Sequence, residues 1–279
     1  MGISDSDFNF VRTFIHNRAG IVLEPGKEYL ADARLSPLLR QSSFKNLSEL
    51  VAELRTNSFS PWNSKVVDVL TTNETSFFRD HAPFEALRTY VIPELIAARR
   101  CEKRLNIWYA ASSTGQEPYS VAMLLAEHIT ELATWDVSHL ATDISTEALD
   151  RARQGRYAQF ETNRGLPATY LEKYFDRDGL EWVLKDYIRK AVRFEELNLN
   201  KAWPALPSMD IVMMRNVMIY FDLESKRDIL GKVAHLLRPD GCLFLGAAET
   251  TMHFDERFSQ ARRDRSGCYR CDMQYKQTG

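Results

Sequence analysis

The hydrophobic pattern of this chain changes near residue 84, and that change limits the possible folds more than any other feature. In residues 1–68 there is no convincing strand, and apolar residues such as Phe8, Val11 and Ile15 recur at helical spacing. From about residue 84, apolar runs typical of strands alternate with helical patterns, which predicts a mostly parallel α/β sheet. We therefore expect an N-terminal helical domain (1–68), a linker (69–83) and a sheet domain (84–279).

The N-terminal domain contains at least three helical patterns, around residues 8–15, 30–39 and 47–54. In the second, Ser36 and Pro37 look like an N-cap followed by proline at the first helical position. We expect a kink or a restart of the helix at that point.

Five apolar runs in the sheet domain predict strands, at 105–111, 137–145, 192–199, 209–221 and 242–249. Helices are expected at 118–129, 146–153 and 224–237, with a turn at 238–241 and a closing hairpin within 258–269. Residues 160–192 fit neither pattern, so we interpret them as an insertion into the sheet domain.

Composition and charge argue against several classes of partner. The 279 residues carry a formal net charge of −2, which gives no general attraction to nucleic acid. The apolar runs are too short to insert into a membrane, and the N-terminus does not resemble a secretory signal. The four cysteines are then expected to be reduced thiols, so the sequence predicts a cytoplasmic protein without a metal site.

Polar residues gather where the predicted strands end, which is where open α/β sheets bind ligands. The small-residue turn at 109–120 lets main chain approach a ligand, but it is neither G-x-G-x-x-G nor a Walker motif. A purely structural turn remains open at this stage. Asp143 ends the next strand, where it could accept hydrogen bonds from ribose hydroxyls or cap the following helix.

Two further segments combine several kinds of functional group. Arg215, Asn216 and Tyr220 follow a hydrophobic strand, in the run 215–221. The segment TTNETSFFRD (71–80) lies between the two domains and carries amide, hydroxyl, carboxylate and guanidinium groups. The simpler interpretation of this segment is a linker whose Phe77 and Phe78 pack and whose Asp80 or Thr75 caps a helix. Arg79 would then be a surface residue that pairs with Asp80 or a neighbouring acid.

In this order, the segments together resemble one family, the chemotaxis receptor methyltransferases or CheR family. The resemblance covers nearly the whole chain and rests mainly on TTNETSFFRD and RNVMIYFD (215–222), with STGQEPYS, ATDIS, ARQGRY and LRPDGCLFLGAAE in support. It implies a class I S-adenosylmethionine-dependent methyltransferase fold, Rossmann-like, with a small N-terminal all-α domain and a small β-subdomain inserted at about 160–192.

Matched position by position, the resemblance implies which residues form the site. The residues expected to line the S-adenosylmethionine site are Asn73, Thr75, Arg79, Glu117, Asp143, Asn198, Leu199, Arg215 and Asn216. Arg79 and Tyr220 match residues near the reacting methyl group, and S-adenosylhomocysteine would be the product. Ala111 and Ser112 stand where the family often has glycine and cysteine, and Gln116 where glutamate is common.

The implied reaction is methyl transfer to glutamate side chains of chemotaxis receptors. A glutamate with a pKa near its ordinary value of about 4.3 is already ionised at neutral pH, so no general base is required. Two alternatives stay open, a methyltransferase for another substrate and a non-catalytic scaffold that binds S-adenosylmethionine. The chain has no N/D-P-P-Y motif, which counts against amino methylation of nucleic acid.

The resemblance also suggests how receptors would be bound. Lys27, Arg34 and Arg40, followed by Lys45, are expected to form a basic face towards the acidic methylation helices of the receptors. In some members the β-subdomain grips a pentapeptide at the receptor's C-terminus, through a longer loop after a Tyr-Phe pair. Here few residues follow Tyr174 and Phe175 before a strand pattern resumes, so we expect methylation that does not need the pentapeptide.

Overall fold

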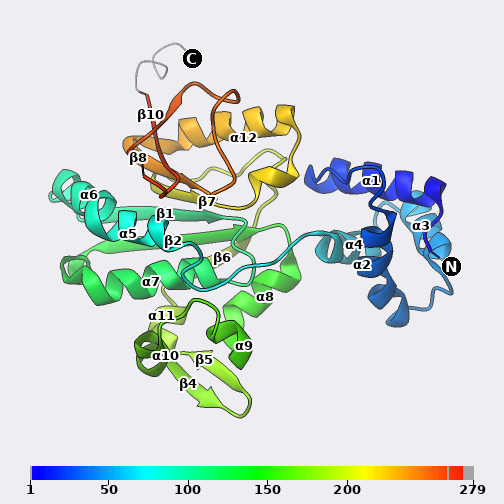
Figure 1. The fold of residues 1–279 in the computed structure, drawn as a ribbon, viewed down its shortest axis with the longest axis horizontal. Coiled ribbons are helices and arrows are strands. Elements are labelled where there is room, and N and C mark those ends of the chain that lie inside the picture. The colour runs from blue at the N-terminus through cyan, green and yellow to red at the C-terminus, as the bar shows by residue number, and fades with distance from the viewer. Residues whose placement is uncertain (1, 263, 273–279) are drawn as a thin grey trace.

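The computed structural model describes residues 2–262 and 264–272, so the final residues of the predicted sheet domain lie outside the described residues. Figure 1 shows a helical part and a larger sheet-containing part, joined by an extended linker. Within the described residues no helix combines the length and apolar character needed to cross a membrane.

The helical part consists of α1 (Asp5–Ala19), α2 (Glu28–Arg40), α3 (Leu47–Thr56) and α4 (Trp62–Leu70). Ser4 and Asn46 cap α1 and α3 by accepting hydrogen bonds from main-chain amides in the first turn. The apolar faces of the four helices share one buried cluster, which includes Val11, Leu35 and Val66.

The structure contradicts a restart of the helix at Ser36 and Pro37, which was one of the two expected outcomes. Pro37 lies inside α2, which continues without interruption to Arg40. A proline in a helix removes the hydrogen bond to the carbonyl four residues earlier, here that of Ala33. Ala33 and Pro37 are both exposed, so water can reach this side of the helix and lower the cost of the missing bond. The helical pattern also continues in α4 to Leu70, which sequence patterns did not single out.

The main sheet has seven strands in the order β6-β2-β1-β7-β8-β10-β9. Its strands are β1 (Arg104–Ala110), β2 (Asp136–Asp143), β6 (Val192–Glu196), β7 (Met209–Met214), β8 (Leu237–Leu245), β9 (Phe258–Gln260) and β10 (Cys268–Cys271). The first five pair in parallel, and β10 adds antiparallel to β8 and β9. The predicted α/β class, the mostly parallel sheet and the closing hairpin are confirmed.

One prediction within the sheet needs correction. The turn expected at 238–241 belongs to β8, which begins at Leu237 directly after the preceding helix. The pairing with β7 is irregular there, because Met209 pairs with Leu237 whereas Ile211 already pairs with Cys242. The chain therefore departs from regular pairing at the predicted turn residues without leaving the strand.

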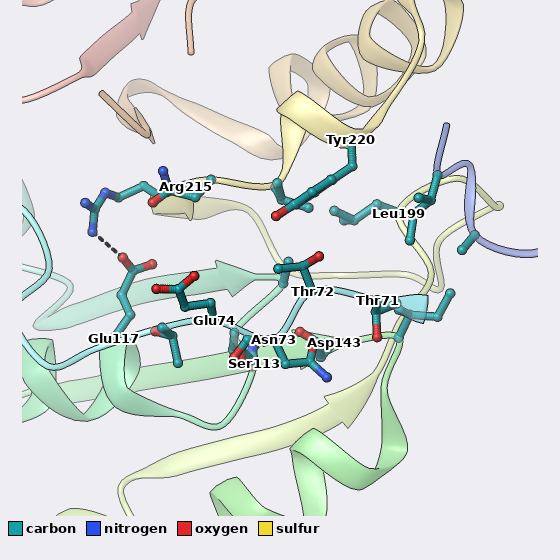
Figure 2. A pocket seen from close by; sticks show the side chains of 18 of the residues that line it. Thr71, Thr72, Asn73, Glu74, Ser113, Glu117, Asp143, Leu199, Arg215 and Tyr220 are labelled. Carbon is teal, nitrogen blue, oxygen red and sulfur yellow. Dashed lines mark hydrogen bonds and ion pairs between the residues drawn. The ribbon is translucent and has the colours of Figure 1, made fainter. Parts of the chain in front are cut away.

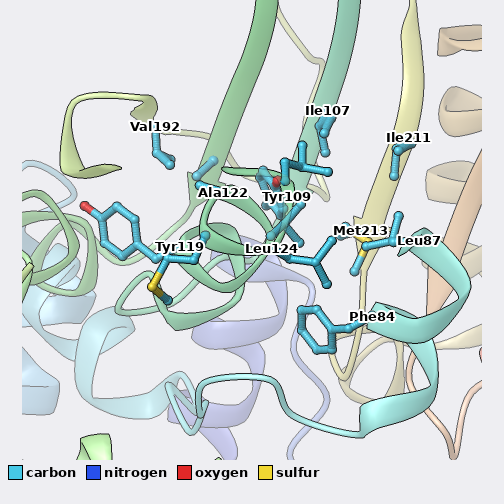
Figure 3. Close-up of a cluster of buried hydrophobic side chains, with 14 of the residues drawn as sticks. Phe84, Leu87, Ile107, Tyr109, Tyr119, Ala122, Leu124, Val192, Ile211 and Met213 are labelled. Atoms are coloured by element: carbon cyan, nitrogen blue, oxygen red, sulfur yellow. The ribbon is translucent and has the colours of Figure 1, made fainter. Parts of the chain in front are cut away.

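Helices cover both faces of the sheet (Figure 1). The linker leads into α5 (His81–Ala86), η1 (Leu87–Val91) and α6 (Ile92–Arg99), and further helices are α7 (Gln116–His128), η2 (Thr130–Thr134), α8 (Thr146–Gln154), η3 (Met218–Tyr220) and α12 (Leu223–Leu236). Successive side chains of β1 point alternately to the two faces of the sheet. Ile107 and Tyr109 belong to the larger buried cluster, which also contains residues of the helices from α5 to α8; Figure 3 shows part of it. Trp108 belongs to the other cluster, with residues of α12.

The irregular segment (160–192) and residues 156–158 just before it form a small antiparallel sheet in the order β3-β5-β4. Its elements are β3 (Arg156–Ala158), α9 (Gln159–Thr162), α10 (Ala168–Tyr174), β4 (Phe175–Asp178), β5 (Glu181–Leu184) and α11 (Asp186–Arg189). Only Gly179 and Leu180 connect β4 to β5, and Gly179 has a φ of +60°. This is a tight hairpin of the kind that needs a left-handed residue.

Candidate functional site

A cavity of about 850 Å³, a volume that includes space open to solvent, lies at the carboxyl ends of β1, β2 and β7. Figure 2 shows that the linker segment around Thr72 and Asn73 crosses it. All of the predicted site residues line the cavity: Asn73, Thr75, Arg79, Glu117, Asp143, Asn198, Leu199, Arg215, Asn216 and Tyr220. Their individual roles remain predictions.

The turn after β1 forms the floor of the cavity through left-handed main chain. Ala111, Ser113 and Gly115 have φ values of +57°, +51° and +90°. A side chain at Gly115 would have its Cβ 3.0 Å from that of Ala152, so this position needs glycine for space as well as conformation. Ala111 occupies the same region without that freedom, at the position where the resemblance leads us to expect glycine.

Asp143 is buried, and both of its carboxylate oxygens accept main-chain hydrogen bonds. The N–H of Ser113 donates to Oδ2 (2.8 Å) and that of Ser145 donates to Oδ1 (2.9 Å). Burial raises the pKa of Asp143, while these amides act in the opposite direction. The helix cap is Ser145, whose Oγ accepts from the N–H of Ala148, so Asp143 does not cap α8.

Arg215 ties the end of β7 to α7 and to the linker. Its side chain is 1% exposed and forms ion pairs with Glu117 and with Asp80, the latter at 2.8 Å. It also donates to the main-chain oxygen of Arg79 (2.8 Å). Asp80 lies at the N-terminus of α5 but makes no side-chain cap there, which rules out Asp80 as the capping residue. Glu117 Oε1 has no hydrogen bond to any described residue, which leaves it able to accept one from a ligand.

Arg79 is a cation at the cavity without an ion pair to any described residue, and its Nη1 donates only to the main-chain oxygen of Glu74 (3.1 Å). The alternative in which Arg79 pairs with Asp80 is wrong, because Arg215 holds that carboxylate. The guanidinium of Arg79 is therefore available to a carboxylate of a ligand.

Tyr220 enters the cavity from η3, opposite the linker segment (Figure 2). Its hydroxyl has no hydrogen bond to any described residue, and the N–H of Val22 donates to its main-chain oxygen (2.9 Å). An isolated β-bridge between Ile21 and Phe221 adds a second link to the helical part. The phenol is thus fixed at its base and free at its hydroxyl, as expected of a group that contacts a bound molecule.

The environment of Asn198 differs from that expected of a residue whose main role is to bind the cofactor. Its Nδ2 donates to the main-chain oxygen of Arg18 (2.5 Å), and its Oδ1 accepts from the N–H of Asn200 (2.9 Å). Both halves of the amide are used within the protein, and one of them reaches the helical part. Leu199 is buried beside it.

Sequence reasoning missed several lining residues. Ala19 and Ile21 come from the end of α1 and the segment that follows, and no motif there indicated a site. The others are neighbours of recognised motifs and could have been found from them: Thr71, Thr72, Glu74, Ala111, Ser112, Ser113, Ile144, Leu197, Val217 and Phe221.

The predicted basic face is only partly a free surface. Arg34 is half-buried, and it donates to the main-chain oxygen of Leu70 (2.6 Å) and to Oγ1 of Thr72 (2.8 Å), so it braces the linker. Lys27 pairs with Glu24 at 3.0 Å. Arg40 is exposed and has no ion pair to any described residue.

The lining chemistry fits an adenosine cofactor with an amino-acid end. The carboxylates of Glu74, Glu117 and Asp143, the guanidinium of Arg79 and close main chain meet in one cavity with mixed polar and apolar walls. Carboxylates suit ribose hydroxyls and an ammonium group, and a guanidinium suits a carboxylate. No group of three or more metal-ligating residues occurs in residues 2–262 and 264–272.

Two family descriptions match the chain almost end to end. "CheR methyltransferase, all-alpha domain" matches residues 6–71, and "CheR methyltransferase, SAM binding domain" matches residues 73–266. The second description names the predicted cofactor, S-adenosylmethionine.

Relatives of the same description occur in several bacteria. Chemotaxis protein methyltransferase 1 of Pseudomonas aeruginosa is 41% identical over 94% of this chain and 96% of its own length. The corresponding proteins of Vibrio cholerae and Escherichia coli are 37% and 36% identical, over 93% of this chain and 94% and 89% of theirs. A glycopeptide N-methyltransferase solved with S-adenosylmethionine is 16% identical over 69% of this chain and 67% of its own, with a TM-score of 0.34.

Proposed function

Because the chain belongs to the CheR methyltransferase family, we propose that it transfers methyl groups from S-adenosylmethionine to glutamate side chains of chemotaxis receptors in the cytoplasm. The observation that carries the proposal is that two polar groups without side-chain partners line the same cavity. The guanidinium of Arg79 and the hydroxyl of Tyr220 line it together with the carboxylates of Asp143 and Glu117, and neither has a side-chain partner among the described residues.

The carboxylates would hold the two polar ends of S-adenosylmethionine. Asp143, fixed by two main-chain amides, would accept hydrogen bonds from the ribose hydroxyls with its remaining lone pairs. Glu117, fixed by Arg215, would accept from the ammonium group through its free oxygen. Asn73, Thr75, Leu199 and Asn216 would complete the walls, and Arg215 and Asn198 would act mainly through the residues that they hold.

Bound S-adenosylmethionine supplies an electrophilic methyl group next to a positive sulfur. The protein's own task is then to orient an incoming carboxylate and to exclude water from it. The Tyr220 hydroxyl would donate one hydrogen bond to the glutamate carboxylate without greatly lowering its nucleophilicity. Arg79 would contact the cofactor or the carboxylate loosely, because a tight bidentate clamp would stabilise the ground state. An ionised glutamate needs no general base.

Receptor docking would involve the helical domain, residues 1–68. Of the basic residues predicted for that surface, Arg40 is the one whose charge is exposed and unpaired among the described residues. Lys27 would contribute less, because its ammonium group is partly neutralised by the ion pair with Glu24. Arg34 would contribute indirectly, since its guanidinium holds the linker (69–83) that crosses the cavity.

The inserted β-subdomain, about residues 160–192, would act without a receptor pentapeptide. Its hairpin turn comprises only Gly179 and Leu180, so the loop offers few main-chain groups to an added peptide strand. The insertion also contacts the linker, since Arg164 pairs with Glu74 at 2.6 Å and Phe175 packs edge-on against Phe77.

One incubation tests the proposed reaction. The purified protein is mixed with methyl-labelled S-adenosylmethionine and receptor-containing membranes, and label released by mild base is counted. Methyl esters of glutamate release methanol in base, so base-labile label on the receptor is the expected result. Base-stable label would point to another substrate, and binding of S-adenosylmethionine without transfer would point to a scaffold. Adding free pentapeptide to the protein should give no saturable binding at micromolar concentrations.

A further inference from the structure

Glu249 joins the two loops at the end of the sheet, although it does not itself line the cavity. Its Oε2 accepts hydrogen bonds from the N–H groups of Asn216 (2.7 Å) and Gly246 (2.7 Å). Its Oε1 accepts from the N–H of Ile219 (3.2 Å). Gly246 follows β8, and the other two residues follow β7, so one carboxylate fixes both loops.

The loop after β7 needs such a support. Asn216 has a φ of +60°, a left-handed conformation that is uncommon outside glycine, although asparagine adopts it more readily than most residues. The same loop leads directly into η3, where Tyr220 follows Ile219. The N–H groups of Asn216 and Ile219 donate hydrogen bonds to this charged acceptor, and these bonds hold the loop in its observed conformation.

The packing around Gly246 shows how closely the two loops approach. A Cβ at this position would lie 2.6 Å from Nδ2 of Asn216, 2.8 Å from Oε2 of Glu249 and 2.9 Å from the main-chain nitrogen of Asn216. Only glycine leaves room for the carboxylate to reach both amides. The steric requirement for glycine at this position supports the arrangement separately from the hydrogen bonds.

We propose that Glu249 is a positioning residue for methyl transfer. It holds Asn216 at the cavity wall and, through Ile219, sets the place of the Tyr220 hydroxyl. The inference rests on the proposed function, in which that hydroxyl orients the substrate carboxylate. Glu249 acts through main chain alone and needs no contact with either substrate.

Two substitutions separate support of the loop from general stability. In Glu249→Gln, the carbonyl oxygen can still accept from Asn216 and Gly246, but the amide nitrogen cannot accept from Ile219. In Glu249→Ala, all three bonds are lost. Turnover should fall about tenfold in the first variant and up to about a hundredfold in the second, because small displacements of a positioned group cost that much. Glu256→Ala is the matched control, since Glu256 is exposed in the same segment.

A merely structural role would lower the melting temperature without changing how much Tyr220 matters. Tyr220→Phe is therefore measured in the wild-type and Glu249→Gln backgrounds. If Glu249 acts through Tyr220, the loss of turnover seen in wild type should largely disappear in the second background. Affinity for S-adenosylhomocysteine, measured by calorimetry, should change less than turnover in Glu249→Gln.

Each other result has a defined meaning. Wild-type turnover in Glu249→Gln, or losses that simply multiply in the double variant, would overturn the inference and leave the proposed function intact. Unchanged turnover in Tyr220→Phe alone would also overturn it, because no hydroxyl position would then need support. A wild-type protein that forms no methyl esters on receptors would contradict the proposed function itself, and the inference with it.

Discussion

Gly165 of the inserted subdomain lies directly against the main-chain oxygen of Phe77 in the linker. A Cβ at this glycine would lie 2.0 Å from that oxygen, far inside any possible contact, and its φ of +86° independently favours glycine. Phe77 is itself fully buried, with its ring edge-on to Tyr157 and Phe175 of the same subdomain. The linker that crosses the cofactor cavity is therefore clamped from outside by the insertion.

Gly165→Ala should displace the linker and destabilise the protein by roughly 2 kcal/mol or more, through steric overlap added to backbone strain. Gly179→Ala is the matched control, because its φ is also positive but nothing lies within 4 Å of a Cβ there. It should cost only about 1 kcal/mol. Urea unfolding of both variants measures the difference, and equal losses would show that the contact with Phe77 yields easily.

Asp143→Ala should weaken binding of S-adenosylhomocysteine by about 1–3 kcal/mol, the cost of leaving buried polar partners unpaired. The variant also frees the amides of Ser113 and Ser145, so its fold must be checked by circular dichroism before calorimetry. Unchanged affinity in a folded variant would refute the assignment of Asp143 to the cofactor.

Arg40→Glu should slow receptor methylation by roughly tenfold at low salt, and the loss should shrink as salt screens the charge. Affinity for the cofactor and the melting temperature should not change, because Arg40 is exposed and unpaired among the described residues. Equal rates for this variant and wild type at low salt would exclude a docking role.

Arg34→Glu should behave differently from Arg40→Glu. Arg34 donates to Leu70 and Thr72, so reversing its charge removes the brace of the linker and places a carboxylate near main-chain oxygens. We expect a lower melting temperature and weaker cofactor binding, in addition to slower methylation. Loss of methylation alone, at full stability, would show that Arg34 is a docking residue as first predicted.

Asp222 should make stability depend on acid pH. Its carboxylate contacts Nε2 of His16 at 2.7 Å and caps α12 through the N–H of Ser225, and these contacts, with that of His16 the largest, lower the pKa of Asp222 from 3.8 to about 2. A depressed folded pKa stabilises the protein above 3.8, and the effect is lost as the pH falls towards 2.

Asp222→Ala should therefore lower the free energy of unfolding at pH 7 by roughly 0.5–2 kcal/mol, the usual range for loss of an N-cap. The difference from wild type should shrink as the pH falls through that acidic window. Urea unfolding at neutral and acid pH measures both values. A difference that stays constant with pH would mean that the ion pair with His16 and the charge-assisted cap contribute little.

Local patterns predicted those helices and strands that can be recognised from the hydrophobic pattern of their own residues. The buried runs of β1 and β7 are apolar because both faces of a parallel sheet are covered, and this can be seen without a structure. A restart of the helix at Pro37 was expected but does not occur. The cost of a proline inside a helix depends on whether water reaches the carbonyl four residues earlier, which a sequence does not reveal. The turn residues at 238–241 misled because a strand can absorb an irregularity in its pairing.

The site was predictable as far as motifs reached. Asp143 and Glu117 could be placed at strand and helix ends, and the cavity contains both. Ala19 and Ile21 could not be found, because they reach the cavity through the packing of α1 beside η3, a contact between segments far apart in the chain. The bracing role of Arg34 was hidden for the same reason, since a basic residue on a helix reads as surface charge until its partner is known.

The cavity has walls from both parts of the molecule, with Ala19 and Ile21 on one side and the strand ends on the other. A small rotation of the helical part about the linker would therefore alter the volume that holds the cofactor.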